Sequence, residues 1–213
     1  MCGLTGSGKS RLLAALQAEG AQVLDLERLA RHRGSLLGDL PRDPQPSQKA
    51  FDTALLTALE SFAAARPVYV ESESRKIGAI QVPDSLLDAM RRAACVRVDT
   101  PRELRVALLK DEYLHFIEDP ASLADKLQPL VPMHGRKVID RWIEAATAGD
   151  FDTLVDELLE THYDPTYGRS ILRNFPRHAE ALRVTPRAID MPAFRALARD
   201  LDSQVNAASP VVA

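Results

Sequence analysis

The chain has 213 residues, of which 46% are hydrophobic and 27% are charged, and its formal net charge is −3. This composition is typical of a folded globular protein. The slightly negative net charge excludes binding of nucleic acid through a positive field of the whole chain. The sequence has no apolar run long enough to span a bilayer and no signal-peptide core, which predicts a cytoplasmic protein. Its two cysteines, Cys2 and Cys95, form no C-x-x-C pair and indicate neither a disulfide framework nor a zinc site.

A glycine-rich motif opens the chain: residues 3–10 read GLTGSGKS and match the pattern G-x-x-x-x-G-K-S/T at every fixed position. Glycines let such a loop adopt positive φ and bring its backbone amides close to phosphate oxygens. Lys9 adds a positive charge near the terminal phosphates, and the Ser10 hydroxyl is placed for Mg²⁺. The helix expected over residues 11–18 turns its positive end to the same anion. The predicted phosphate-binding residues are Gly3, Thr5, Gly6, Ser7, Gly8, Lys9 and Ser10.

A phosphate loop normally follows a buried strand, whereas only two residues precede this one. We therefore expect the first strand to be truncated, in a chain that is an excerpt or a truncated product. Strands and helices alternate afterwards, which indicates a parallel sheet with right-handed crossovers. The predicted fold class is α/β: a P-loop NTPase-like parallel sheet of about five strands with flanking helices, plus a helical subdomain. The later strands are expected at residues 21–27, 67–71, 95–99 and 184–189.

A helical subdomain is predicted to interrupt this core. Apolar residues recur at helical spacing from residue 120 onward, and the polar, aromatic segment HYDPTYGRS at 162–170 is predicted to form a turn. The expected domains are a P-loop α/β core at 1–119, the helical subdomain at 120–173, the last strand and helix of the core at 174–202, and a disordered tail at 203–213.

The strand expected at 67–71 ends in the segment ESESRK. An apolar strand that ends in an acid is typical of the second half of a phosphate-loop nucleotide site, where the carboxylate holds Mg²⁺ directly or through water. Glu71 is the first candidate and Glu73 the second, so the predicted metal ligands are Ser10 and Glu71. Arg75 and Lys76 follow them and either bind a second anion or are simply solvated.

Two further segments are candidates for binding anions. ARHRGS at 30–35 follows a predicted strand, at the edge where open α/β sheets bind ligands, although a solvated turn explains it equally well. QPSQK at 45–49 crowds the start of a helix that Ser47 can cap. The cations Arg102, Arg105 and Lys110 either reach a transferring phosphoryl group or are surface charges. The predicted contacts to an anion or to tRNA are Arg31, His32, Arg33, Ser47, Gln48, Lys49, Arg75 and Lys76.

Four segments, in this order, resemble the C-terminal phosphate-loop domain of the tRNA 2-selenouridine synthase family. They are residues 3–10, 23–35, 45–51 and 70–78. The first is shared by very many nucleotide-binding proteins, whereas ARHRGS, QPSQK and ESESRKIG are far more particular. The later segment HYDPTY is also similar, so the resemblance covers nearly the whole chain up to residue 173.

The resemblance implies a transferase that replaces the sulfur of 2-thiouridine at the tRNA wobble position with selenium. It also implies selenophosphate and geranyl diphosphate as co-substrates, and tRNA and a rhodanese domain or selenophosphate synthase as partners, with no membrane involved. The rhodanese domain that carries the family's catalytic cysteine is absent from this sequence, and neither Cys2 nor Cys95 lies in a rhodanese loop. No catalytic residue is therefore assigned, and we expect this chain alone to be incomplete for selenium transfer.

Two other interpretations stay open. The strand-to-helix junction at residues 99–103 and the helical insert after it are similar to the lid-bearing half of small kinases, so the alternative is a stand-alone kinase for a small molecule or nucleotide. In that case the loop at 3–10 holds ATP or GTP rather than the diphosphate of geranyl diphosphate. The third interpretation is a nucleotide-dependent RNA-binding module without chemistry, whose tRNA affinity depends steeply on salt.

Overall fold

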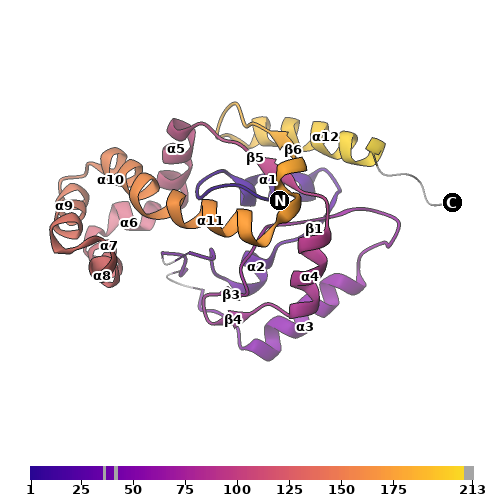
Figure 1. The fold of residues 1–213 in the computed structure, drawn as a ribbon, viewed down its shortest axis with the longest axis horizontal. Coiled ribbons are helices and arrows are strands. Elements are labelled where there is room, and N and C mark those ends of the chain that lie inside the picture. The colour runs from indigo at the N-terminus through magenta and orange to yellow at the C-terminus, as the bar shows by residue number, and fades with distance from the viewer. Residues whose placement is uncertain (36, 41–42, 209–213) are drawn as a thin grey trace. The chain divides into compact units, whose positions relative to one another are not determined.

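The computed structural model describes residues 1–35, 37–40 and 43–208, which form a mixed α/β structure (Figure 1). These residues divide into two compact units. The sheet unit comprises Met1–Gly3, Gly8–Asp99 and the chain from Ile171 onward, and the helical unit comprises Leu4–Ser7 and Thr100–Ser170. Within the described part of the chain, no helix has both the length and the hydropathy needed to cross a membrane.

Parallel strand pairs form the centre of the sheet unit. Strand β1 (Gln22–Leu24) pairs with β2 (Val68–Val70), and β5 (Val96–Val98) pairs with β6 (Leu182–Val184), both in parallel. These pairings confirm the predicted α/β class. The last strand, however, lies at 182–184 and not at the predicted 184–189, since a loop leads from it into the last helix.

The first two residues connect the two strand pairs. The carbonyl oxygen of Met1 accepts a hydrogen bond from the backbone of Ser72 at 2.8 Å. On the other side, the Cys2 N–H donates to Val96 at 2.7 Å, and the Cys2 carbonyl accepts from Val98 at 2.8 Å. Residues 1 and 2 therefore lie between β2 and β5, and the chain enters the glycine-rich loop directly beside the end of β2.

Helices and one hairpin complete the sheet unit. A short antiparallel hairpin of β3 (Lys76–Ile77) and β4 (Ile80–Gln81) was not expected from the sequence. The helices are α1 (Lys9–Ala18), α2 (Leu26–Ala30), α3 (Gln48–Glu60), α4 (Asp84–Arg92) and α12 (Met191–Ala208), with a 3₁₀ turn at Pro176–Glu180. Helix α12 packs against α1 and continues to Ala208, so residues 203–208 of the predicted disordered tail are helical, and the rest of that tail lies outside the described residues.

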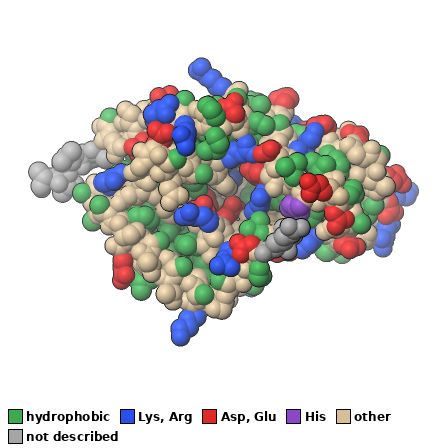
Figure 2. Space-filling view, turned by 180° about the vertical axis from the view of Figure 1, so that it is seen from behind, with side chains coloured by type: hydrophobic (Ala, Val, Ile, Leu, Met, Phe, Trp, Pro, Cys, Tyr) green, Lys and Arg blue, Asp and Glu red, His purple; other side chains and the backbone are tan. Residues whose placement is uncertain are grey.

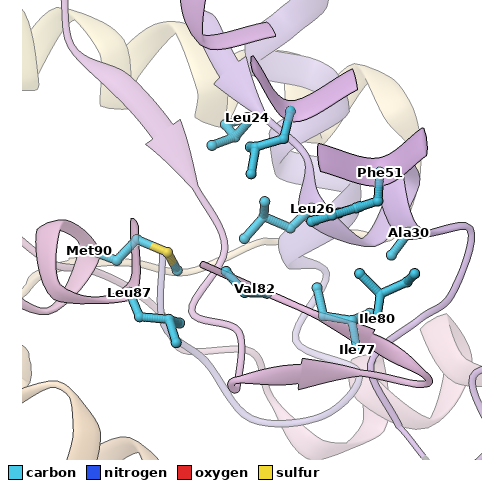
Figure 3. Close-up of a cluster of buried hydrophobic side chains, with 10 residues drawn as sticks. Leu24, Leu26, Ala30, Phe51, Ile77, Ile80, Val82, Leu87 and Met90 are labelled. Carbon is cyan, nitrogen blue, oxygen red and sulfur yellow. The ribbon is translucent and has the colours of Figure 1, made fainter. Parts of the chain in front are cut away.

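A buried apolar cluster fixes these elements against one another (Figure 3). Phe51 and Leu55 lie one turn apart on α3 and face the short helix α2, and the β3–β4 hairpin and α4 close the other side. The spacing of the apolar residues in α3 matches the helical repeat, which is why the sequence predicted this helix. The cluster consists of Leu24, Leu26, Ala30, Phe51, Leu55, Ile77, Ile80, Val82, Leu87 and Met90.

The helical unit is built from short helices around Trp142, which is 1% exposed and donates its indole N–H to Glu157 at 2.9 Å. It begins at Thr100 and not at the predicted residue 120, because the first helix packs on α10. Its elements are α5 (Arg102–Glu112), α6 (Leu114–Glu118), α7 (Pro120–Leu127), a 3₁₀ turn (Gln128–Leu130), α8 (Val131–His134), α9 (Arg136–Thr147), α10 (Phe151–Leu158), a π-helical segment (Leu159–Tyr163) and the start of α11 (Asp164–Asn174).

The predicted turn at residues 162–170 is wrong, since this segment is helical. The backbone N–H of Asp164, the first residue of α11, donates to the carbonyl of Leu159 in the π-helical segment before it. Pro165 fits there because a proline near the start of a helix removes a donor that has no intrahelical partner.

We predict that replacing Phe51 with alanine lowers the free energy of unfolding by about 3–5 kcal/mol, because the ring is fully buried in the apolar cluster. Leu56→Ala on the same helix is the matched control, since Leu56 is 56% exposed, and it is expected to change stability by less than about 0.5 kcal/mol. Urea denaturation followed by circular dichroism measures both. Equal losses in the two variants would contradict this core assignment.

Candidate functional site

The glycine-rich loop has the conformation that a phosphate loop requires. Gly6 and Gly8 have φ of 72° and 80°, a region that residues with a side chain rarely adopt, and Gly8 forms the start of α1. The Lys9 ammonium donates a hydrogen bond to the Gly3 carbonyl at 2.9 Å, so the cation lies over its own loop. Ser7 is buried and its N–H donates to Leu4 at 3.1 Å.

Three side chains link the start of α1 to the ends of β1 and β2. The Ser10 hydroxyl donates to one carboxylate oxygen of Glu27 at 3.1 Å. The backbone N–H of Glu27, in the first turn of α2, donates to Oε1 of Glu71 at 2.8 Å. Glu71 follows β2 directly and is 2% exposed, and its other oxygen, Oε2, is buried without a hydrogen-bond partner among the described residues. An unpaired buried carboxylate oxygen is costly, so this atom is a candidate ligand for a cation.

Several acidic side chains lie close together at this site, and their negative charges repel one another. Burial, and secondly the nearby charge of Asp25, raise the pKa of Glu71 to about 8, although the N–H from Glu27 opposes this shift. Desolvation and the charges of Glu27 and Glu71 raise the pKa of Glu73 as well, while Lys9 lowers it. We call Asp25, Glu27, Glu71 and Glu73 the acid cluster. A cation bound beside these acids would reduce the repulsion between them.

Sequence reasoning missed Glu27 as part of the site. The predicted strand at 21–27 is shorter in the structure and ends at Leu24. The Asp25 side chain accepts a hydrogen bond from the backbone N–H of Arg28 at 2.8 Å and thereby caps the start of helix α2. This cap places Glu27 in the first helical turn, with its N–H directed at Glu71. An Asp directly after an apolar strand, followed by the acid Glu27 in the first turn, is the signal that predicts such a cap.

The ARHRGS segment lies beside the acid cluster. A Cβ on Gly34 would lie 2.8 Å from a carboxylate oxygen of Glu73 and 3.1 Å from one of Glu27. His32 is buried; its Nδ1 accepts from the Gly34 N–H at 3.0 Å, and its Nε2 lies 3.2 Å from Asp39. Glycine at 34 thus permits the close approach of this loop to the acids.

The two arginines of that segment are engaged within the loop region. Arg31 ends α2 with a positive φ of 50° and forms an ion pair with Asp43 at 3.0 Å. The backbone N–H of Arg33 donates to Gly38 at 2.9 Å. Their predicted role as contacts to an anion or tRNA stays a prediction.

The QPSQK segment makes contacts that stabilise the fold. Ser47 caps α3, accepting from Ala50 at 3.2 Å, and Gln48 bonds both backbone groups of Gln81 at 2.8 and 2.9 Å. Gln45 donates to Ile77 at 2.9 Å and thereby ties the loop to β3. Lys49, in the first turn of α3, is exposed.

The remaining predicted cations differ in their surroundings. Arg75 forms an ion pair with Asp84, and Lys76 is exposed on β3. In the helical unit, Arg102 pairs with Asp156, and Lys110 with Asp152 at 2.7 Å. On the face in Figure 2, Lys and Arg side chains are interspersed with Asp and Glu.

The residues around Ser10 fit a magnesium ion. Mg²⁺ prefers oxygen ligands and usually takes only one or two carboxylates from the protein, with water and substrate phosphates completing the shell. The Ser10 hydroxyl and the unpaired oxygen of Glu71 are oxygen atoms of this kind, and their role as metal ligands stays a prediction. In the described ranges, no group of three or more His, Cys, Asp or Glu side chains is arranged to hold a metal ion.

We predict that the stability of the wild-type chain falls as pH rises from about 5 to 8, measured by urea denaturation in buffer with EDTA. The folded protein raises the pKa of Glu71 from 4.5 to about 8, so it binds the proton more strongly than the unfolded chain, and ionisation costs at most about 1.4 kcal/mol per pH unit. Glu71→Gln is expected to flatten this slope, whereas Glu60→Gln, at an exposed position of α3, leaves it unchanged. An unaltered slope in the Glu71 variant would disprove the assignment.

Comparisons with known proteins show which family the chain resembles. Residues 1–129 match the family model described as the tRNA 2-selenouridine synthase AAA domain. The tRNA 2-selenouridine synthase of Nitrosomonas europaea is 38% identical over 133 residues, which are 61% of this chain and 34% of that protein. That of Nitrosomonas eutropha is 32% identical over 160 residues, 68% of this chain and 41% of that protein. That of Hahella chejuensis is 44% identical over 110 residues, which are 50% of this chain and 27% of that protein.

The matched region contains the glycine-rich loop and the acid cluster. The aligned part of the chain spans between 27% and 41% of the length of these curated relatives. No solved structure matches the chain. Since the family model covers more than half of its residues, the chain belongs to the tRNA 2-selenouridine synthase family and contains that family's AAA-type domain.

Proposed function

We propose that this chain is the phosphate-loop domain of a tRNA 2-selenouridine synthase and that residues 3–10 bind the diphosphate of geranyl diphosphate during geranylation of the tRNA thiouridine. The observation that carries the proposal is the arrangement at the start of α1. Ser10 is hydrogen-bonded to Glu27 and Glu27 to Glu71, and Lys9 lies over a loop in which Gly6 and Gly8 have positive φ. The curated relatives are named tRNA 2-selenouridine synthases, which supports the tRNA substrate.

The loop is suited to stabilising a leaving diphosphate. In prenyl transfer the bond between the prenyl carbon and the diphosphate oxygen breaks, and negative charge grows on that oxygen. Backbone amides that face this position stabilise the charge without reorganisation, and the Lys9 ammonium adds a positive charge beside them. Lys9 would exchange the Gly3 carbonyl for a diphosphate oxygen, which replaces a neutral acceptor with an anionic one.

Magnesium would be held by Ser10 and Glu71. When bound, Mg²⁺ neutralises charge on the diphosphate oxygens. Glu27 orients the Ser10 hydroxyl, and the proton that burial favours on Glu71 is released when a cation binds, so metal affinity would rise with pH.

The reaction as a whole needs more than this domain. We propose that the sulfur-to-selenium replacement, with selenophosphate as donor, depends on a rhodanese domain or a selenophosphate synthase acting with this chain in the cytoplasm. Arg31, Arg33, Lys49 and Lys76 are the proposed contacts for the tRNA backbone, because phosphates are bound mainly by cations.

We predict that the wild-type chain binds geranyl diphosphate in the presence of Mg²⁺ and that Lys9→Ala weakens this binding by about a hundredfold, since the charge-assisted hydrogen bonds of the ammonium are lost. Isothermal titration calorimetry measures the affinity. Lys137→Ala, an exposed lysine of α9, is the control and should bind as the wild type does. Wild-type affinity in the Lys9 variant would contradict the proposal.

The kinase alternative is tested with the same protein. If the loop serves phosphoryl transfer, ATP or GTP binds in place of geranyl diphosphate, and phosphate is transferred to a small acceptor. We expect no such transfer across a panel of small acceptors. Transfer that Lys9→Ala abolishes would favour the kinase and count against the prenyl donor.

A further inference from the structure

The tip of the phosphate loop is bonded to the helix that follows β5. The Thr100 hydroxyl donates to the Ser7 carbonyl at 2.7 Å. The Arg105 guanidinium donates through Nε to the Thr5 carbonyl at 2.9 Å. Two alternate carbonyls of the loop are thus held by side chains at the start of α5, within the helical unit.

These two bonds determine where the loop amides point. In a trans peptide the C=O of one residue and the N–H of the next lie in one plane and point in opposite directions. Fixing the carbonyls of Thr5 and Ser7 toward α5 therefore directs the N–H groups of Gly6 and Gly8 away from that helix. Amides directed into one concavity are what a phosphate loop offers to an anion.

Arg105 is itself held rigidly. It is 4% exposed, and its two terminal nitrogens pair with the two carboxylate oxygens of Asp164, one of them at 3.0 Å. Such a two-point pair fixes the plane of the guanidinium and hence the direction of its Nε–H. The loop also packs tightly on this helix, since a Cβ on Gly6 would lie 2.8 Å from Leu109.

We propose that Thr100 and Arg105 are positioning residues that orient the loop amides for a diphosphate, with Asp164 holding Arg105. The proposal rests on the proposed function of the loop. It gives Arg105 a role different from both sequence interpretations, since the guanidinium is neither a surface charge nor directed at a phosphoryl group: it bonds the back of the loop.

The test compares Thr100→Val with Thr100→Ser in the full 213-residue chain. Valine has the shape of threonine but no donor, whereas serine keeps the hydroxyl. Titration with inorganic pyrophosphate and Mg²⁺ should show binding about tenfold weaker for valine and within about twofold of wild type for serine. Arg102→Gln is a control on the same helix, since Arg102 pairs with Asp156. Arg105→Lys is expected to weaken binding too, but loss of a buried pair also affects folding.

A second readout needs no ligand: amide hydrogen exchange of residues 3–10, followed by mass spectrometry, should be faster in Thr100→Val than in Thr100→Ser. If wild-type chain binds pyrophosphate and the valine variant binds it equally well, the positioning role is wrong while the proposed function stands. If wild-type chain binds neither pyrophosphate nor geranyl diphosphate, the proposed function fails. Equal loop exchange in the two variants would then overturn the positioning role as well, and faster exchange with valine would support it.

Discussion

The pairing of residues 1 and 2 with β2 on one side and β5 on the other is the constraint on which the site depends. It uses only a few backbone hydrogen bonds, yet it sets two positions at once. The glycine-rich loop begins at a fixed position beside the sheet, and β2, which leads into Glu71, lies next to the start of that loop. Because the strands are parallel, their carboxyl ends meet at one edge, where open α/β sheets bind ligands.

At that edge, several carboxylates lie next to the glycine-rich loop, for which we propose anion binding. Glu27 accepts a hydrogen bond from Ser10, and the charge of Lys9 acts on Glu73. Glu71 is buried with an oxygen that has no partner among the described residues. Left alone, this arrangement costs stability. We propose that a divalent cation between the acids and a diphosphate balances both charges, and this charge balance is the physical reason to expect the two ligands to bind together.

Much of the fold and of the candidate site could be predicted from the sequence, and the features that were missed have physical causes. The glycine-rich loop and Glu71 are local patterns, so spacing and hydrophobicity were enough to select them as candidates, and their binding roles stay predictions. Glu27 was missed because a single cap at Asp25 turns a predicted strand end into a helix start. The segment at 162–170 was predicted as a turn from its residue types, whereas its tertiary setting makes it helical. The pairing of Arg105 with Asp164 joins residues far apart in sequence, which no local pattern reports.

The central claim is that residues 3–10 hold a diphosphate with a cation beside Glu71. A crystal structure of the chain with Mg²⁺ and inorganic pyrophosphate tests it most directly. We predict that the diphosphate lies on the loop amides, that the Lys9 ammonium has moved from the Gly3 carbonyl to a phosphate oxygen, and that Mg²⁺ lies next to Ser10. Pyrophosphate bound only at the ARHRGS or QPSQK segment, with Lys9 still on Gly3, would contradict it.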